Sequence, residues 1–251
     1  MAADVGLAAI TDPDAFAATR ESWHRLAEHV LAPARYRATG RIGLRAAPGG
    51  FGTPTYPNAE GDEEQVRVEG IALLLVRNEE PWSVPITTVG EAARTVGIEP
   101  GAPANLYTPN TPLEPDAPLT VDEAAADRLG TWYEVANLVL EQLRTDSAAA
   151  DNASLVQLWP EHFDLAVDIG AEDRGARGTF GASPGDGAHA EPYLYVTHWA
   201  GVADDPFWND TTFAGASLQY AELVAAAEPA GRALDFFRRG REALGRAANP
   251  G

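Results

Sequence analysis

The segment from residue 99 to residue 119 constrains the fold more than any other part of the chain. It holds six prolines: Pro100, Pro103, Pro109, Pro112, Pro115 and Pro118. Proline has no backbone N–H and its ring fixes φ, so this segment can sustain neither a helix nor a sheet ladder. It predicts a proline-rich connector (99–119) between two halves, 1–98 and 120–251, which are expected to form one compact body.

The first half is expected to begin with a helix and to continue as strands. Asp12 followed by Pro13 is a typical helix start, with a capping side chain and proline in the first turn. Pro33 is expected to end this helix. Alternation from residue 39 to residue 46 predicts a half-buried strand, and the apolar run within 65–77 predicts a long strand buried on both faces.

Two histidines lie on the first predicted helix, His24 and His29. They are five residues apart, which is not the i, i+4 spacing that lets two imidazoles on an α-helix share a metal ion. We therefore interpret them as structural residues that are partly exposed. A short helix is expected at 88–98, ended by Gly97.

The second half repeats this pattern of helix, strands and helix. Thr120 and Glu123 match a capping box ahead of a long amphipathic helix, and a last helix is expected from about residue 229 to residue 246. Between these helices, 163–169 and 193–198 have the character of strands. The sequence thus predicts an α+β fold with two similar β-rich halves and flanking helices.

A weak internal pseudo-repeat supports this division. In each half an alternating strand is followed by a glycine-rich stretch, a polar loop and an apolar strand. The stretches that correspond are 50–54 with 179–184, and 71–76 with 192–196. If these stretches are equivalent, a ligand is expected in a cleft between two related halves.

Composition excludes several classes of function. The chain has 18 basic and 37 acidic residues, a net charge of −19, which repels nucleic-acid phosphates and anionic membrane surfaces. Lysine is absent, so neither a pyridoxal phosphate Schiff base nor a P-loop lysine is available. Cysteine is also absent, which removes iron–sulfur clusters, disulfides and thiol nucleophiles.

Localisation follows from what the sequence lacks. The first 14 residues have no basic region of the kind that begins a signal peptide. The longest aliphatic run, 71–76, falls far short of the ~20 residues that span a bilayer. We expect a cytoplasmic protein with no membrane partner.

The candidate site centres on residues 158–220, which hold three of the five histidines. Strict alternation in the predicted strand 162–169 would place His162 and Asp164 side by side on one face. His189 and Glu191 lie in the following loop. Imidazoles and carboxylates together can bind zinc, manganese or iron and leave a position open for water. The same residues also fit a structural hydrogen-bonded pair.

Aromatic residues give the second signal. In the strand that begins at Tyr193, alternation places Tyr193, Tyr195 and Trp199 on one face and Leu194, Val196 and His198 on the other. Aromatic side chains with a polar tip can line an apolar pocket and orient a ligand. The alternative interpretation is a core rich in large rings.

Four stretches also carry a resemblance to a known family: LWPEHFDLA at 158–166, SPGD at 183–186, EPYLYV at 191–196 and TGRIGLRAAPGGFGTP at 39–54. They resemble a family of uncharacterised bacterial proteins with a domain of unknown function. The resemblance implies a bacterial origin and supplies no substrate, cofactor or catalytic residue.

Three functions fit these observations. The leading hypothesis is small-molecule binding in a cleft of the C-terminal half, lined by His162, Asp164, Tyr193, Tyr195, His198 and Trp199. The alternative is a metal-dependent hydrolase with a divalent zinc, manganese or iron ion bound by His162, Asp164, His189 and Glu191. A third is an interaction protein whose exposed aromatic residues form a partner surface.

Overall fold

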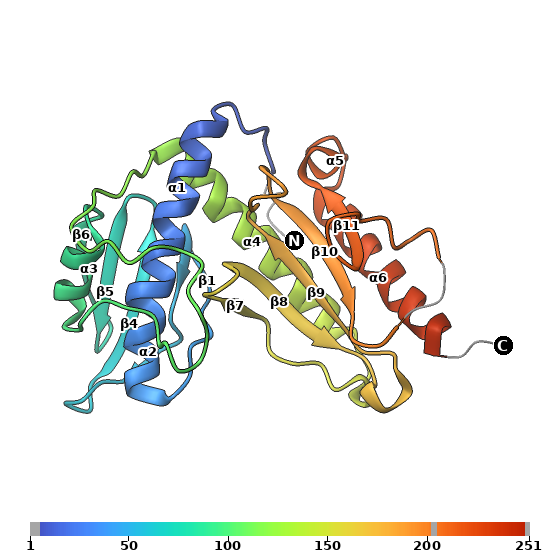
Figure 1. The fold of residues 1–251 in the computed structure, drawn as a ribbon, viewed down its shortest axis with the longest axis horizontal. Helices are drawn as coiled ribbons and strands as arrows, with labels where there is room; N and C mark the ends of the chain where they lie inside the picture. Colours follow the sequence, from blue (N-terminus) through green and yellow to red (C-terminus); the bar gives the residue numbers. More distant parts are fainter. Residues whose placement is uncertain (1–5, 202–204, 249–251) are drawn as a thin grey trace. The chain divides into compact units, whose positions relative to one another are not determined.

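The computed structural model describes residues 6–201 and 205–248, which divide into two compact units (Figure 1). The N-terminal unit comprises Ile10–Glu134 and Gln157–Phe163. The C-terminal unit comprises 6–9, Val135–Val156 and the described residues from Asp164 onward. Each unit contains an antiparallel sheet and helices, so the predicted α+β class with two β-rich halves is confirmed.

The N-terminal unit begins with the expected helix, α1 (Pro13–Leu26). The Asp12 carboxylate caps it by accepting a 3.0 Å hydrogen bond from the Ala15 N–H. The predicted end at Pro33 is wrong, because the chain forms a π-helical segment, η1 (Ala27–Leu31), and then α2 (Ala32–Thr39). Pro33 lies in the first turn of α2, where its fixed φ suits a helix start.

The sheet of this unit contains β1 (Arg45–Ala47), β2 (Gly50–Gly52), β4 (Glu63–Glu69), β5 (Ala72–Arg77) and β6 (Glu80–Pro85), with neighbours in that order, while β3 (Tyr56–Pro57) pairs with β4. The single long strand predicted at 65–77 is wrong. Gly70 adopts a φ of 55°, which most side chains disfavour, and allows the chain to turn between β4 and β5. The strand β7 (Gln157–Trp159) joins this unit through a bridge from Leu158 to Leu44.

The edge strand β6 is protected from pairing with another strand. The Ile86 N–H donates to the Ile71 carbonyl, and because strands alternate, the backbone N–H positions at 81, 83 and 85 face away from β5. Two of these positions are Pro81 and Pro85, which have no N–H. Prolines of this kind prevent edge-to-edge association.

The proline-rich segment 99–119 packs inside the N-terminal unit, so the division of the chain differs from the one expected from the sequence. It follows α3 (Val89–Val96) and runs along α1 and η1 as an irregular strap, here called the strap (99–122). The Gly101 N–H donates to the His29 carbonyl, and the Arg25 guanidinium lies 2.8 Å from the Glu114 carboxylate. Individual hydrogen bonds and ion pairs with the helices, and not a sheet ladder, thus hold this segment in place.

The long helix α4 (Glu123–Thr145) follows the strap and contributes residues to both units. Its start differs from the predicted capping box. Asp122 caps the helix by accepting a 2.9 Å hydrogen bond from the Ala125 N–H, while the Thr120 backbone N–H and carbonyl both bond to the Ser22 hydroxyl. Thr120 therefore holds the strap on α1.

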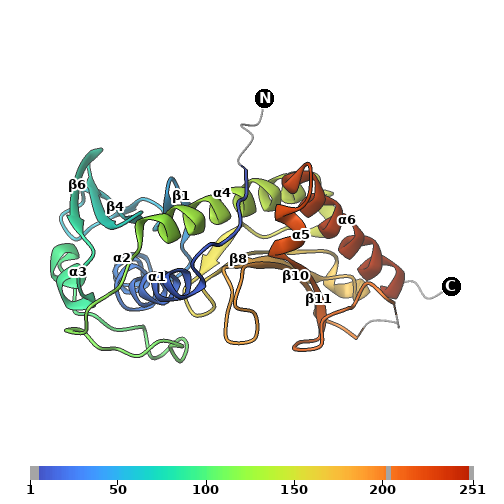
Figure 2. The ribbon, with the colours of Figure 1, turned by 90° about the horizontal axis from the view of Figure 1, so that it is seen from above.

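In the C-terminal unit the antiparallel order is β11 (Gly215–Gln219), β10 (Tyr193–His198), β9 (Gly178–Ser183) and β8 (Asp164–Ile169). Helix α6 (Pro229–Ala248), reached through α5 (Tyr220–Val224), covers one face of this sheet (Figure 2). Phe237 of α6 packs its ring edge-on against Phe180 of β9. The short helical turns η2 (Ala149–Asp151) and η3 (Glu172–Arg174) complete the unit.

The opposite face of this sheet carries polar and aromatic side chains. Its residues in β8, β9 and β10 are Asp164, Ala166, Asp168, Thr179, Gly181, Ser183, Tyr193, Tyr195 and Thr197, as the pairing register shows, and Trp199 follows β10 beside Thr179. The exposed edge at β11 is closed by Asn209, whose side-chain amide bonds to both the N–H and the carbonyl of Ser217. We call the face opposite α6 the polar sheet face.

Strands β4, β5 and β6 are neighbours in chain order, as are β8, β9, β10 and β11, and β2–β4 and β9–β10 are joined through polar loops. This agrees with two β-rich halves, while the internal pseudo-repeat stays a prediction. In the described part of the chain, no helix has both the length and the apolar character that crossing a membrane requires.

Candidate functional site

The predicted pair His162 and Asp164 does not lie on one strand. His162 is exposed in a turn of the N-terminal unit, and β8 begins only at Asp164, in the C-terminal unit. Phe163 between them has a left-handed φ of 55°, which breaks the alternation of a strand. The expectation of a side-by-side imidazole and carboxylate is therefore wrong.

Local packing explains why Phe163 tolerates this conformation. Its carbonyl accepts a 2.8 Å hydrogen bond from the buried Tyr133 hydroxyl. Its ring stacks on His24 with centroids 5.0 Å apart and meets the Phe51 ring edge-on at 5.1 Å. These contacts offset the conformational strain, which typically costs ~1–3 kcal/mol.

Asp164 and Tyr195 form the first cluster on the polar sheet face. The Tyr195 hydroxyl donates to the Asp164 carboxylate, which is buried, and burial together with this negative charge raises the pKa of Tyr195 well above its ordinary value. Gly181 lies opposite Tyr195 in the neighbouring strand. A Cβ at position 181 would come within 2.2 Å of the Tyr195 ring, so glycine lets the ring cross β9 to reach Asp164.

We expect Gly181→Ala to displace Tyr195 and to break its hydrogen bond with Asp164. The expected cost is about 1–3 kcal/mol in the free energy of unfolding, since the buried carboxylate loses a donor. Absorbance titration should also show a tyrosine with a lower pKa than in the unmodified protein. Gly187→Ala, where an added Cβ meets nothing within 4 Å, is the control. An unchanged tyrosine titration in Gly181→Ala would contradict this account.

A second cluster joins two loops beside β10. The Tyr193 hydroxyl donates to Asp186 at 2.7 Å, and the His189 imidazole lies 3.6 Å from Asp186 and 3.5 Å from Asp210. Burial opposes ionisation of both aspartates, but hydrogen bonds lower the pKa of Asp186 and hold the pKa of Asp210 at about 2. Both carboxylates interact with other groups of the protein, so the cluster holds the loop before β10 against the loop after it.

The residues proposed as metal ligands have different surroundings. Asp164 is bonded to Tyr195, His189 faces two aspartates, and Glu191 is exposed. Within 6–201 and 205–248, no group of three or more His, Asp or Glu side chains is placed to hold a metal ion. Binding of zinc, manganese or iron by the predicted set stays a prediction.

Trp199 provides the most accessible aromatic ring of the C-terminal unit, with 50% of the residue exposed. Three contacts fix it. Its backbone N–H donates to the Arg177 carbonyl at 3.1 Å, and its indole N–H donates to the Thr179 hydroxyl at 3.0 Å. The Arg177 guanidinium covers one side of the ring, 4.9 Å from its centroid.

His198, the remaining predicted ligand residue, lies on the other face of β10. The register pairs His198 with Gly178, and its ring meets the Trp208 ring edge-on at 5.4 Å. Of the predicted ligand residues, the polar sheet face thus carries Asp164, Tyr193, Tyr195 and Trp199. His162 and His198 lie elsewhere.

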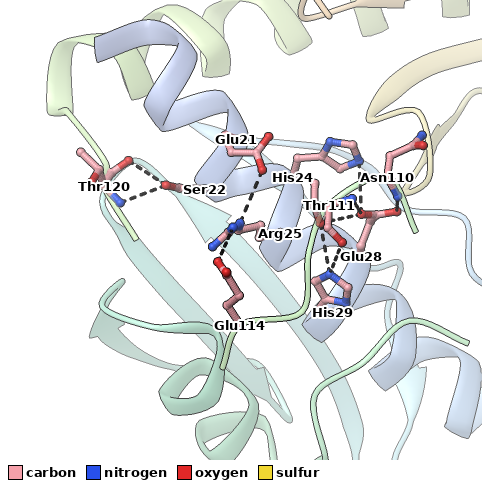
Figure 3. A network of polar contacts seen from close by, with 10 residues as sticks. All are labelled: Glu21, Ser22, His24, Arg25, Glu28, His29, Asn110, Thr111, Glu114 and Thr120. Atoms are coloured by element: carbon pink, nitrogen blue, oxygen red, sulfur yellow. Dashed lines mark hydrogen bonds and ion pairs between the residues drawn. The ribbon is translucent and has the colours of Figure 1, made fainter. Parts of the chain in front are cut away.

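Sequence reasoning missed a buried polar network between η1 and the strap (Figure 3). The Glu28 carboxylate, with no exposed surface, accepts hydrogen bonds from the Asn110 N–H at 2.9 Å, the Thr111 N–H at 2.8 Å and the Thr111 hydroxyl at 2.6 Å. Burial raises the pKa of Glu28, while these donors favour its ionised form. The carboxylate thereby holds the strap on the helix.

Of the two histidines, which were expected to be partly exposed structural residues, His24 is partly exposed. Its Nε2 lies 2.8 Å from the Pro160 carbonyl and 3.8 Å from the Glu28 carboxylate. His29 is buried, which contradicts the expected partial exposure. Its Nε2 lies 3.1 Å from the Thr111 carbonyl, which only accepts, so Nε2 carries the proton. Burial lowers the pKa of His29 and brings that of His24 to about 4.

The chain matches no protein-family model, and comparisons with curated proteins and with solved structures gave no match either. The resemblance to a bacterial family with LWPEHFD and SPGD signatures therefore stays a prediction.

Proposed function

We propose that the protein binds a small organic molecule on the polar sheet face of the C-terminal unit, with Trp199 as the stacking platform. The observation that carries the proposal is the anchored, half-exposed Trp199 ring. Its backbone, its indole N–H and one side of its ring are held by Arg177 and Thr179, which leaves the other side accessible. An aromatic ring held in place before binding loses little entropy when a ligand stacks on it.

Polar groups beside the ring support the same interpretation. The Thr179 hydroxyl donates to the Asp168 carboxylate at 2.8 Å, and Tyr195 is partly exposed on the same face. An accessible aromatic surface with a few oriented polar groups is the usual composition of a small-molecule site. Binding of this kind needs none of the groups that the sequence lacks, such as lysine or cysteine.

The proposal is tested by NMR with ¹⁵N-labelled protein, which resolves the indole N–H signals of the tryptophans. Four probes are titrated separately: adenine, 1-naphthoate, 1-naphthylmethylammonium and methyl glucoside. We expect at least one probe to shift the Trp199 indole signal and Trp199→Ala to weaken its binding at least about fivefold, as stacking contributes ~1–3 kcal/mol.

Trp82→Ala is the matched control, because Trp82 is 55% exposed in the N-terminal unit. Binding should survive this change. If no probe shifts the Trp199 signal, or if binding is the same after Trp199→Ala, the proposed function is wrong.

A further inference from the structure

The side of Trp199 that faces the protein is covered by a positive charge, the guanidinium of Arg177. Arg177 is only 8% exposed, and its Nη1 donates to two backbone carbonyls, those of Asn152 and Gly170, both at 3.1 Å. Among the described residues, no carboxylate forms an ion pair with it. The charge of the Arg177 guanidinium therefore influences the binding of a ligand that stacks on the opposite side of the Trp199 ring.

This charge disfavours a cationic ligand. The negative potential of an aromatic face attracts cations, and on the covered side of Trp199 that attraction is already used by Arg177. A second cation on the accessible side would face the guanidinium across one ring, in a partly desolvated site where like charges repel strongly. Amines and quaternary ammonium compounds are thus poor candidates.

A negative charge, that of Asp168, is linked to the edge of the ring through Thr179. The Trp199 indole N–H bonds to Thr179, whose hydroxyl donates to Oδ1 of Asp168. Oδ2 of Asp168 makes no hydrogen bond within the described parts of the chain, and the side chain is partly exposed. A carboxylate oxygen accepts hydrogen bonds and repels anions. It therefore selects a ligand with N–H or O–H donors at its edge and without negative charge.

We propose that the ligand stacked on Trp199 is a flat, uncharged heteroaromatic ring with N–H donors on one edge, as in an aminopurine or aminopyrimidine. This inference rests on the proposed function and adds the chemical class of the ligand. The ring stacks on the accessible side of Trp199, and its amino edge donates to Oδ2 of Asp168. The contact involves a free base or nucleoside, whose uncharged ring avoids the phosphate repulsion expected for nucleic acid at a net charge of −19.

Three bicyclic probes that differ in charge test this class by NMR and calorimetry: neutral adenine, anionic 1-naphthoate and cationic 1-naphthylmethylammonium. Purine, which lacks the exocyclic amino group, tests the edge contact. We expect adenine to bind most tightly among them. Asp168→Asn should weaken adenine binding by about 10–150-fold, as a hydrogen bond to a charged group contributes ~1.5–3 kcal/mol, and should change purine binding much less.

The outcomes separate this inference from the proposed function. Tighter binding of either charged probe at Trp199, or an equal effect of Asp168→Asn on adenine and purine, overturns the ligand class but leaves a small-molecule site. If no probe binds at Trp199, both the ligand class and the proposed function are wrong. Asp173→Asn, an exposed acidic residue of the same unit, is the control for the loss of one negative charge.

Discussion

Glu28→Ala is expected to lower the free energy of unfolding of the N-terminal unit by about 3–5 kcal/mol, as when one partner of a buried charged network is lost. Three donors, two backbone N–H groups and the Thr111 hydroxyl, would be left without their acceptor. Thr111 is itself buried, so water does not replace the carboxylate freely. Urea unfolding followed by circular dichroism measures the change.

Chemical rescue distinguishes this mechanism from a general loss of helix packing. The Glu28→Ala protein should retain a small space with three hydrogen-bond donors, so formate or acetate should restore part of the lost stability, while chloride at equal ionic strength should restore less. Glu21→Ala is the matched control, because Glu21 lies on α1 in an exposed ion pair with Arg25 at 3.4 Å. Its expected cost is below ~1 kcal/mol. Equal losses in both variants would refute the role of Glu28.

Acidification is expected to destabilise the N-terminal unit between about pH 6.5 and pH 4 through His24. Burial brings the pKa of His24 from 6.5 in the unfolded chain to about 4 in the folded protein, so in this window the unfolded state binds more protons. Stability is therefore present above pH 6.5 and is lost as the pH falls to about 4, by an amount on the order of 3 kcal/mol. His29, whose pKa is also lowered by burial, acts in the same direction.

Glu28 acts in the opposite direction, because its folded pKa is raised and its contribution falls as the pH rises. His24→Gln isolates the histidine term: glutamine can still donate to the Pro160 carbonyl, which His24 Nε2 contacts at 2.8 Å, but it does not titrate. The difference in stability between pH 7 and pH 4 should shrink in this variant. An unaltered pH dependence in His24→Gln would exclude His24 as the cause.

The strap and the site differ in what their polar groups can do. Glu28 is saturated by donors from the strap and has no exposed surface, so its network stabilises the fold. Asp168 has one carboxylate oxygen engaged and is partly exposed beside an accessible ring. Ligand binding needs groups of the second kind, which is why we place function on the polar sheet face.

Local patterns in the sequence determined several elements of this protein. The cap at Asp12 and the helix ended by Gly97 depend on contacts within a few residues, so residue type alone predicted them. Alternation in the stretch from Tyr193 also placed Tyr193, Tyr195 and Trp199 on one face, as the register with β9 and the indole bond to Thr179 show. The α+β class followed from the same periodicities.

Tertiary structure alone decided the rest, because long-range contacts overrode local preference. Proline in the strap excluded regular structure, as predicted, but contacts with helix residues nearly 100 positions earlier placed that segment against α1. His29 is buried within the π-helical segment η1, and the left-handed Phe163 separated His162 from Asp164. No residue pattern encodes such strained conformations, since distant partners such as Tyr133 supply the energy that holds them.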